Sequence, residues 1–354
     1  MAVHSYHEQV DIQNIQKLRE LCASLPPFCQ EFFRGIEPQT ASRTRIAYAY
    51  DLIVFFHYLQ ETNPILAKIP VQEMRVELLD QLTVTDLEEF LQYIKYYNST
   101  SGLDHMNHEN SLKRKLATIK TFYNYFFKKE TIRTNPAALV SMPKIREKNI
   151  VRLEPDEVAQ LLDTVEDGSG LTKQQQAYHS KTGVRDLAIM TLLLGTGIRV
   201  SECVGLDLDD LNLKDGYILI YRKGGKEVTV YFGEEVEEAL LPYLEQRKAM
   251  HPSEGHEKAL FLSLQNRRIS VRAVENLVKK YSETLPTTKK ITPHKLRSTY
   301  GTSLYRETSD IYLVADVLGH SDVNTTRKHY AALEDEHRRS ARNKVQLRDR
   351  RKNV

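Results

Sequence analysis

The sequence contains no tryptophan and only three cysteines in 354 residues. Cys22, Cys29 and Cys203 are odd in number, and none belongs to a Cys-x-x-Cys pair. A framework of paired disulfides and a thiolate zinc site of the usual spacing are therefore excluded. Free cysteines of this kind are typical of a reducing, intracellular compartment.

Long apolar runs are also missing. Runs such as LIVFF at residues 52–56 and LLL at residues 192–194 are far below the roughly 20 residues that a membrane-spanning helix needs. The first thirty residues are polar, include acids and have no signal-peptide core. We therefore expect a cytoplasmic protein without a membrane partner.

A strong overall charge is absent too, because the formal net charge is only +3. Two segments are nevertheless basic. Residues 111–150 carry ten Lys or Arg against two acids, and residues 336–354 carry eight against two. Basic segments suit a polyanion, because each cation that meets a phosphate releases counterions. Either segment alone is explained equally well by a solvated helix face.

The chain is long enough for two domains, and 41% of its residues are hydrophobic. Apolar spacing predicts helices over residues 44–60, 83–97 and 110–130, the second with Thr85 as N-cap and Glu88 completing a capping box. Prolines and charges then indicate an exposed linker. We expect a helical domain over residues 1–145, a linker over 146–153 and a second domain over 154–354 that ends in a basic tail.

The helix at 110–130 has two different faces. Its apolar face contains Leu112, Leu116, Ile119, Phe122 and Tyr123. Four basic residues are predicted to lie largely off that face and to contact DNA, namely Lys113, Arg114, Lys115 and Lys120.

The second domain is predicted to be mainly helical. Helices are expected over residues 154–166, 184–194 (ending at Gly195), 234–250 and 270–285, with a polar surface insertion over residues 167–183. Two β-rich runs around KGGK predict a hairpin over residues 216–232, and ALFLS predicts a short strand over residues 259–263. The fold class is thus mainly α with a small antiparallel β-sheet.

Six residues could carry chemistry as a set: Arg199, Lys223, His294, Arg297, His320 and Tyr330. Each alone reads as an ordinary surface or capping residue. Together they are cations plus one hydroxyl, without an acidic cluster to hold a metal. Such a set suits stabilisation of the charge in a phosphoryl-transfer transition state, with the tyrosine as nucleophile. A phenol with a pKa near 10 needs cations nearby to favour the phenolate.

The motifs GTGIRVSE, RKGGKEVTV, HKLRSTYGT and LGHSDVNTT, followed by a tyrosine, occur in this order over roughly 150 residues. In this the sequence resembles the tyrosine recombinases of the phage integrase superfamily. It is most similar to the Xer type and, by its length, its N-terminal region and its 167–183 insertion, to the single-recombinase branch XerS. The resemblance implies a helical core-binding domain, an α+β catalytic domain, and no cofactor or metal.

The resemblance also implies roles for individual residues. Arg199 and Arg297 would clamp the scissile phosphate, which a planar guanidinium suits. Lys223 would protonate the leaving 5′ oxygen, with Lys226 as the rival. The remaining roles fall to His294 as acid/base residue, His320 as a phosphate hydrogen-bond donor, Glu202 as support for Arg199, and Tyr330 as nucleophile.

The spacing to the tyrosine departs from the pattern. Tyr330 lies ten residues after His320, where many Xer sequences have nine, and His329 occupies the ninth position. Tyr305 and Tyr312 are the alternatives, but both precede His320.

The resemblance implies site-specific recombination through a 3′-phosphotyrosine at a duplex with an inverted-repeat core. The expected role is resolution of chromosome dimers at a dif-like site during segregation, by a homotetramer under possible control by a septal DNA translocase such as FtsK. A mobile-element integrase with the same chemistry and a non-catalytic DNA-binding relative are the alternatives.

Overall fold

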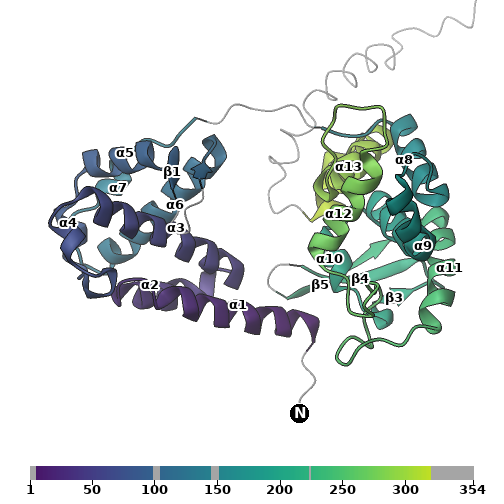
Figure 1. Ribbon diagram of the computed structural model, residues 1–354, viewed down its shortest axis with the longest axis horizontal. Coiled ribbons are helices and arrows are strands. Elements are labelled where there is room, and N and C mark those ends of the chain that lie inside the picture. Colours follow the sequence, from purple (N-terminus) through teal and green to yellow (C-terminus); the bar gives the residue numbers. More distant parts are fainter. Residues whose placement is uncertain (1–4, 99–103, 145–150, 223–224, 320–354) are drawn as a thin grey trace, which may run out of the picture. The chain divides into compact units, whose positions relative to one another are not determined.

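The computed structural model describes residues 5–98, 104–144, 151–222 and 225–319 (Figure 1). The chain forms two compact units, Met1–Lys148 and Asn149–Val354, called unit 1 and unit 2 below. Both units are mainly helical, and their sheets are small and antiparallel. The predicted fold class is confirmed.

The described residues of unit 1 form helices and one largely exposed two-stranded sheet. Its α-helices are α1 (Tyr6–Cys22), α2 (Phe28–Ile36), α3 (Ser42–Thr62), α4 (Leu78–Gln81), α5 (Val84–Tyr93), α6 (Glu109–Lys128) and α7 (Pro136–Leu139). Short 3₁₀ turns are η1 (Glu37–Gln39), η2 (Leu66–Lys68) and η3 (Val71–Glu73). Strands β1 (Tyr96–Asn98) and β2 (Asp104–Met106) pair antiparallel.

Phenylalanines fill the core of unit 1. Phe28 of α2 lies within 6.0 Å, ring centre to ring centre, of Phe56 in α3 and Phe122 in α6. Phe32 meets Phe122 edge to face at 5.0 Å, and Phe126 meets Phe122 at 5.2 Å. Edge-to-face pairs add about 0.5–1.5 kcal/mol each beyond their area burial. These rings therefore join α2, α3 and α6, and they fix the orientation of α6.

The start and the end of α5 both differ from the prediction. The N-cap is Thr83, not Thr85: its backbone N–H donates to the Asp86 carboxylate at 2.7 Å, and its hydroxyl accepts from the Asp86 N–H. Thr83 and Asp86 have the same box spacing as Thr85 and Glu88, and the earlier start sends Leu87 into the core. The helix ends at Tyr93 rather than at residue 97, because the chain then enters β1.

The described residues of unit 2 form helices and a three-stranded sheet (Figure 1). Its α-helices are α8 (Pro155–Asp167), α9 (Lys173–Thr196), α10 (Val200–Gly205), α11 (Glu234–Lys248), α12 (Val271–Ser282), α13 (Pro293–Thr308) and α14 (Ile311–Leu318). After the 3₁₀ turn η4 (Leu208–Asp210), strands β3 (Leu211–Asn212), β4 (Tyr217–Arg222) and β5 (Lys226–Tyr231) pair antiparallel in that order. The predicted hairpin is confirmed, with Arg222 opposite Lys226.

The polar stretch at residues 167–183 is mostly exposed, as predicted, and its second half is the first half of α9. Thr172 caps this helix in a box with Gln175. Gly183 lies within the helix, where a Cβ would overlap the His179 ring. Gly195 does not end the helix either: it packs against Val236, and Gly197, with φ of 61°, forms the end.

Residues 259–263 do not form the predicted strand. Ala259 and Leu262 make isolated bridges to Asp207 and Arg268 instead. The run is apolar because Leu260, Phe261 and Leu262 are all buried. Burial of consecutive residues gives the same apolar signal as a strand without requiring a long partner.

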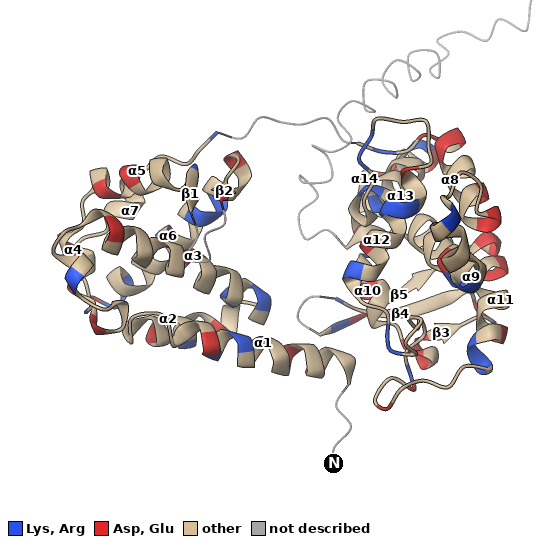
Figure 2. Ribbon diagram, in the orientation of Figure 1, with Lys and Arg blue, Asp and Glu red and all other residues tan. Residues whose placement is uncertain are grey.

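The helices of unit 2 differ in charge. Acidic residues occupy the first turns of α8 and α11, where they interact favourably with the positive end of the helix dipole. Figure 2 shows acidic positions along α8 and basic positions on α13. In the part of the chain that the structure describes, none of the helices combines the length and apolar character that crossing a bilayer requires.

Candidate active site

Three arginines from separate elements meet the carboxyl end of α14. This helix ends at Leu318, and Gly319 follows with φ of 61°. The last carbonyls of a helix have no partners within it and carry partial negative charge. Here the carbonyl oxygens of residues 316–319 accept hydrogen bonds from Arg199, Arg222 and Arg297. The carbonyls that this arginine cluster contacts directly precede His320 in the chain.

Arg297 connects α13 to Gly197 and to the end of α14. It is only 5% exposed. One guanidinium nitrogen donates to the Gly197 carbonyl at 2.6 Å, and the other donates to the Leu318 carbonyl. Gly197 is left-handed, and a Cβ there would overlap the Tyr300 ring. Glycine in the GTG motif is therefore required both by the backbone and by the approach of α13.

Arg199 is the N-cap of α10 and is held by Glu202. The Glu202 carboxylate, 5% exposed, accepts from the Arg199 backbone N–H and from its guanidinium, both at 2.7 Å. Another guanidinium nitrogen donates to the Gly319 carbonyl at 3.3 Å. The Arg199 side chain remains 42% exposed. The guanidinium is thus held in one direction, while part of the side chain remains exposed to solvent.

Arg222 is a member of the cluster that the sequence reasoning missed. As the last residue of β4, it donates to the Val317 carbonyl at 2.7 Å and to the Asp316 carbonyl at 3.4 Å. Its position directly before Lys223 was visible in the sequence. Nothing in the strand pattern indicated that its side chain would turn toward α14, which lies about a hundred residues later.

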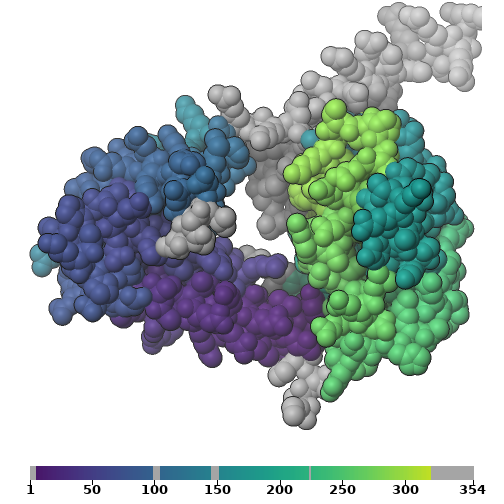
Figure 3. Space-filling model, in the orientation of Figure 1, coloured from purple at the N-terminus to yellow at the C-terminus, as the bar shows by residue number. Residues whose placement is uncertain are grey.

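The other candidates of α13 and α14 differ in exposure. His294 is exposed in the first turn of α13, and its carbonyl accepts from the Ser298 hydroxyl at 3.0 Å. Of the alternative nucleophiles, Tyr305 is 5% exposed and packs with Val314 and Leu318, whereas Tyr312 is 71% exposed. In the space-filling view, the yellow-green residues of α13 and α14 lie beside the teal residues of α8 and α9 (Figure 3).

Lys223, His320 and Tyr330 lie outside the described residues. Their chain neighbours do not: Arg222 precedes Lys223, and Gly319 precedes His320. The Arg222 guanidinium fills the space where a Cβ on Gly319 would stand. The described residues that directly precede two of the predicted catalytic residues are therefore in contact with each other.

The basic helix α6 of unit 1 only partly matches its prediction. Lys113 is exposed, and Lys120 donates to the Ala138 carbonyl at 3.3 Å. Lys115 does not lie off the apolar face but is buried, with its ammonium 3.2 Å from the Asp51 carboxylate of α3. A buried carboxylate on the facing helix, which the helical pattern could not reveal, draws this lysine inward.

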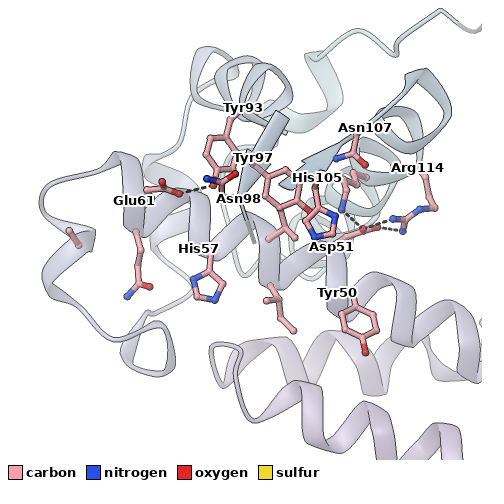
Figure 4. A pocket seen from close by; sticks show the side chains of 15 residues that line it. Tyr50, Asp51, His57, Glu61, Tyr93, Tyr97, Asn98, His105, Asn107 and Arg114 are labelled. Carbon is pink, nitrogen blue, oxygen red and sulfur yellow. Dashed lines mark hydrogen bonds and ion pairs between the residues drawn. The ribbon is translucent and has the colours of Figure 1, made fainter. Parts of the chain in front are cut away.

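Asp51 is also bound by the neighbours of Lys115. Arg114 donates to both carboxylate oxygens, and the Thr118 hydroxyl donates at 2.7 Å. Figure 4 shows Arg114 turned toward Asp51 at the wall of a pocket of about 1040 Å³ in unit 1. Two of the positive charges of α6, those of Arg114 and Lys115, thus pair with Asp51 and connect α6 to α3.

Comparison with known proteins identifies the family. The phage integrase family model matches residues 151–337, more than half of the chain. The chain belongs to the phage integrase family. The expected enzyme class, a tyrosine-type site-specific DNA recombinase, is confirmed.

The relatives include two Xer proteins. The recombinase is 33% identical to tyrosine recombinase XerC of Caldanaerobacter subterraneus subsp. tengcongensis, over 91% of this chain and 87% of that protein. It is 28% identical to tyrosine recombinase XerS of Streptococcus agalactiae, over 91% and 96%. Its fold is similar to that of XerH recombinase in a post-cleavage complex with palindromic difH substrate (TM-score 0.62, 19% identity, 96% and 97% covered).

Proposed function

We propose that the recombinase cuts and rejoins DNA through a covalent 3′-phosphotyrosine on Tyr330. The observation that carries the proposal is the arginine cluster at the end of α14, directly before His320. A scissile phosphate gains negative charge in the transition state, and preorganised guanidinium donors stabilise that charge without reorganising. Removal of one such donor typically costs about 10²–10³ in rate.

The reaction needs only groups of this chain and the DNA. The Tyr330 oxygen attacks phosphorus, and His294 takes up the phenolic proton. The bond from phosphorus to the 5′ oxygen breaks, and Lys223 supplies the proton to that oxygen. In the joining step, an incoming 5′-hydroxyl attacks the phosphotyrosine and releases the phenol. The phosphodiester is thus re-formed without ATP.

Arg199 and Arg297 differ in exposure and in hydrogen bonding before DNA binds. Arg199 has exposed surface through which it can meet a phosphate first, while Glu202 holds its direction. Arg297 donates to the carbonyls of Gly197 and Leu318. A phosphate oxygen at this site would compete with the Leu318 carbonyl for the Arg297 donor, because a charged acceptor forms the stronger bond. DNA binding is then coupled to the end of α14.

At the level of the cell, we propose resolution of chromosome dimers at a dif-like palindromic site. Unit 1 is proposed as the core-binding domain and unit 2 as the catalytic domain, assembled as a homotetramer on two duplexes and open to control by a translocase such as FtsK. The similarity to XerC and XerS proteins supports this role. Selection of bound fragments from the genome tests it: one palindromic chromosomal site agrees, whereas a site at the end of a mobile element would favour an integrase.

The chemistry is tested with Tyr330→Phe, which removes only the phenolic oxygen. We expect loss of the covalent adduct on a nicked suicide substrate and unchanged binding of a half-site in a gel shift. Tyr312→Phe is the matched control and should cleave normally. An adduct that persists in Tyr330→Phe would assign the nucleophile to another residue.

A further inference from the structure

We propose that Arg222 is a positioning residue that fixes the β4–β5 hairpin to the end of α14 and so holds Lys223 at the leaving 5′ oxygen. This inference rests on the proposed role of Lys223 as general acid. Arg222 itself is not proposed to touch the reacting atoms. It acts by tying together two segments that are far apart in the sequence.

The first support is the geometry of the contact. Arg222 is the last residue of β4, is paired with Lys226 of β5, and directly precedes Lys223 in the chain. Its guanidinium donates to the carbonyls of Val317 and Asp316 at 2.7 and 3.4 Å. The adjacent side chains of Tyr221 and Lys226 are exposed. Arg222 therefore connects this end of the hairpin to α14 by hydrogen bonds.

The second support is Gly319, which serves the same contact. Its φ of 61° lies in the left-handed region, where glycine is favoured. A Cβ at this position would also overlap the Arg222 guanidinium. Asparagine, which tolerates the left-handed backbone at many helix ends, would satisfy the first requirement and fail the second. The glycine of the LGH motif thus leaves room for Arg222.

The third support is the energetic cost of placing this side chain. Arg222 is half-buried, and its Nε is buried without a hydrogen-bond partner among the described residues. Burial lowers the pKa of Arg222 below its ordinary value, while Glu202 opposes this shift and Arg199 adds to it. An arginine at the end of a hairpin can remain solvated at no such cost. The carbonyls of α14 offset it and hold the side chain in one direction.

Position matters here because proton transfer requires hydrogen-bond reach. A general acid must come within about 3 Å of the oxygen it protonates. A misplacement of 1 Å can cost on the order of 10² in rate. Loss of Arg222 should therefore impair the step that Lys223 performs and leave phosphate binding by Arg199 and Arg297 in place.

The test compares cleavage of ordinary DNA with cleavage of a 5′-bridging phosphorothiolate, whose thiolate leaves without a general acid. On ordinary DNA, we expect Arg222→Ala to cleave about 10–10² times more slowly. On the phosphorothiolate, its rate should return to within a few-fold of the parent rate. Gly319→Ala, which crowds the guanidinium from the other side, should show the same rescue.

The matched control is Arg247→Ala. Arg247 also donates to backbone carbonyls, those of Glu257 and Ala259, but it does so away from α14. Any rate loss in this variant should be equal on both substrates. Circular dichroism and half-site binding establish that each variant is folded, and Arg222→Lys, which retains the charge on a single donor nitrogen, should be intermediate. An Arg222→Ala defect that sulfur does not relieve would overturn the inference.

Parallel measurements on Lys223→Ala separate the inference from the proposed function. If Arg222 acts through Lys223, the double variant should cleave ordinary DNA no more slowly than Lys223→Ala alone. Rescue of Lys223→Ala without rescue of Arg222→Ala overturns only the positioning role. Failure of sulfur to rescue Lys223→Ala refutes the assignment of the acid, and the inference about Arg222 falls with it.

Discussion

Glu202 shows how one carboxylate can fix both the backbone and the side chain of an arginine. It accepts from both the backbone and the side chain of Arg199, so it sets the start of α10 and the direction of the guanidinium together. The residue is 6% exposed, and its charge is offset by the arginine that it holds. A buried charge is tolerated when it is paired and hydrogen-bonded in this way. The same contact thus caps a helix and fixes the direction of a guanidinium.

We therefore expect Glu202→Ala to slow DNA cleavage by up to about 10², because Arg199 loses its direction rather than its charge. Half-site binding should change little. The cleavage rate of Glu202→Gln should lie between those of the parent and Glu202→Ala, since its amide oxygen can still accept one of the two hydrogen bonds. Single-turnover cleavage measures the effect, with Glu234→Ala on α11 as a surface control. A normal rate in Glu202→Ala would show that Arg199 needs no such support.

At the scale of elements, α3 and α6 are joined by a buried charge as well as by phenylalanine rings. Asp51 is 1% exposed and accepts from three side chains of α6: Arg114, Lys115 and Thr118. Removal of one partner from a buried pair leaves the other charge uncompensated. The orientation of α6, and hence of its exposed lysines, depends on this contact.

Asp51→Ala should destabilise unit 1 by about 3–5 kcal/mol, because Lys115 would remain buried without a counter-charge. Native-state hydrogen exchange of the amides in α3 and α6 measures this locally. Glu20→Ala, which breaks the exposed pair with Lys17 on α1, is the control and should have little effect. Equal protection in Asp51→Ala and the parent would contradict the structural role of the pair.

Because Asp51 pairs with Lys115 but not with Lys113, we expect these two lysines of α6 to contribute differently to DNA binding. Lys113 is exposed, so Lys113→Ala should lower the slope of log affinity against log salt by about 1. Lys115→Ala should instead leave that slope unchanged and lower stability, since its charge already faces Asp51. Gel-shift titrations across a salt series decide this. A full unit of slope lost in Lys115→Ala would restore it as a phosphate contact.

At the scale of the whole molecule, the three cysteines belong to the packed interiors of the two units. Cys22, Cys29 and Cys203 are all buried and free. Burial raises the pKa of each thiol from 9.0, that of Cys203 to about 12. The thiolate is the reactive form, so these shifts suppress reaction in the folded protein.

Native protein should therefore react slowly with an aromatic disulfide reagent at pH 8, and unfolding in guanidinium should expose all three thiols. In the unfolded chain, the rate should rise as pH approaches 9, where the thiolate forms. In the folded protein, Cys203 should stay slow over the same range, because its pKa lies near 12. One thiol that reacts rapidly in the native protein would contradict this expectation.

The sequence by itself determined the helical class and the β4–β5 hairpin, and it predicted which chemical groups form the site. Apolar periodicity and turn residues are local, and the recombinase motifs name arginines, histidines and a tyrosine by their order in the chain. Side-chain partners are not local. Only the tertiary structure brought Arg222 to the carbonyls of α14 and turned Lys115 inward to Asp51. In each case a residue far away in the sequence offers a contact whose free energy exceeds the local preference.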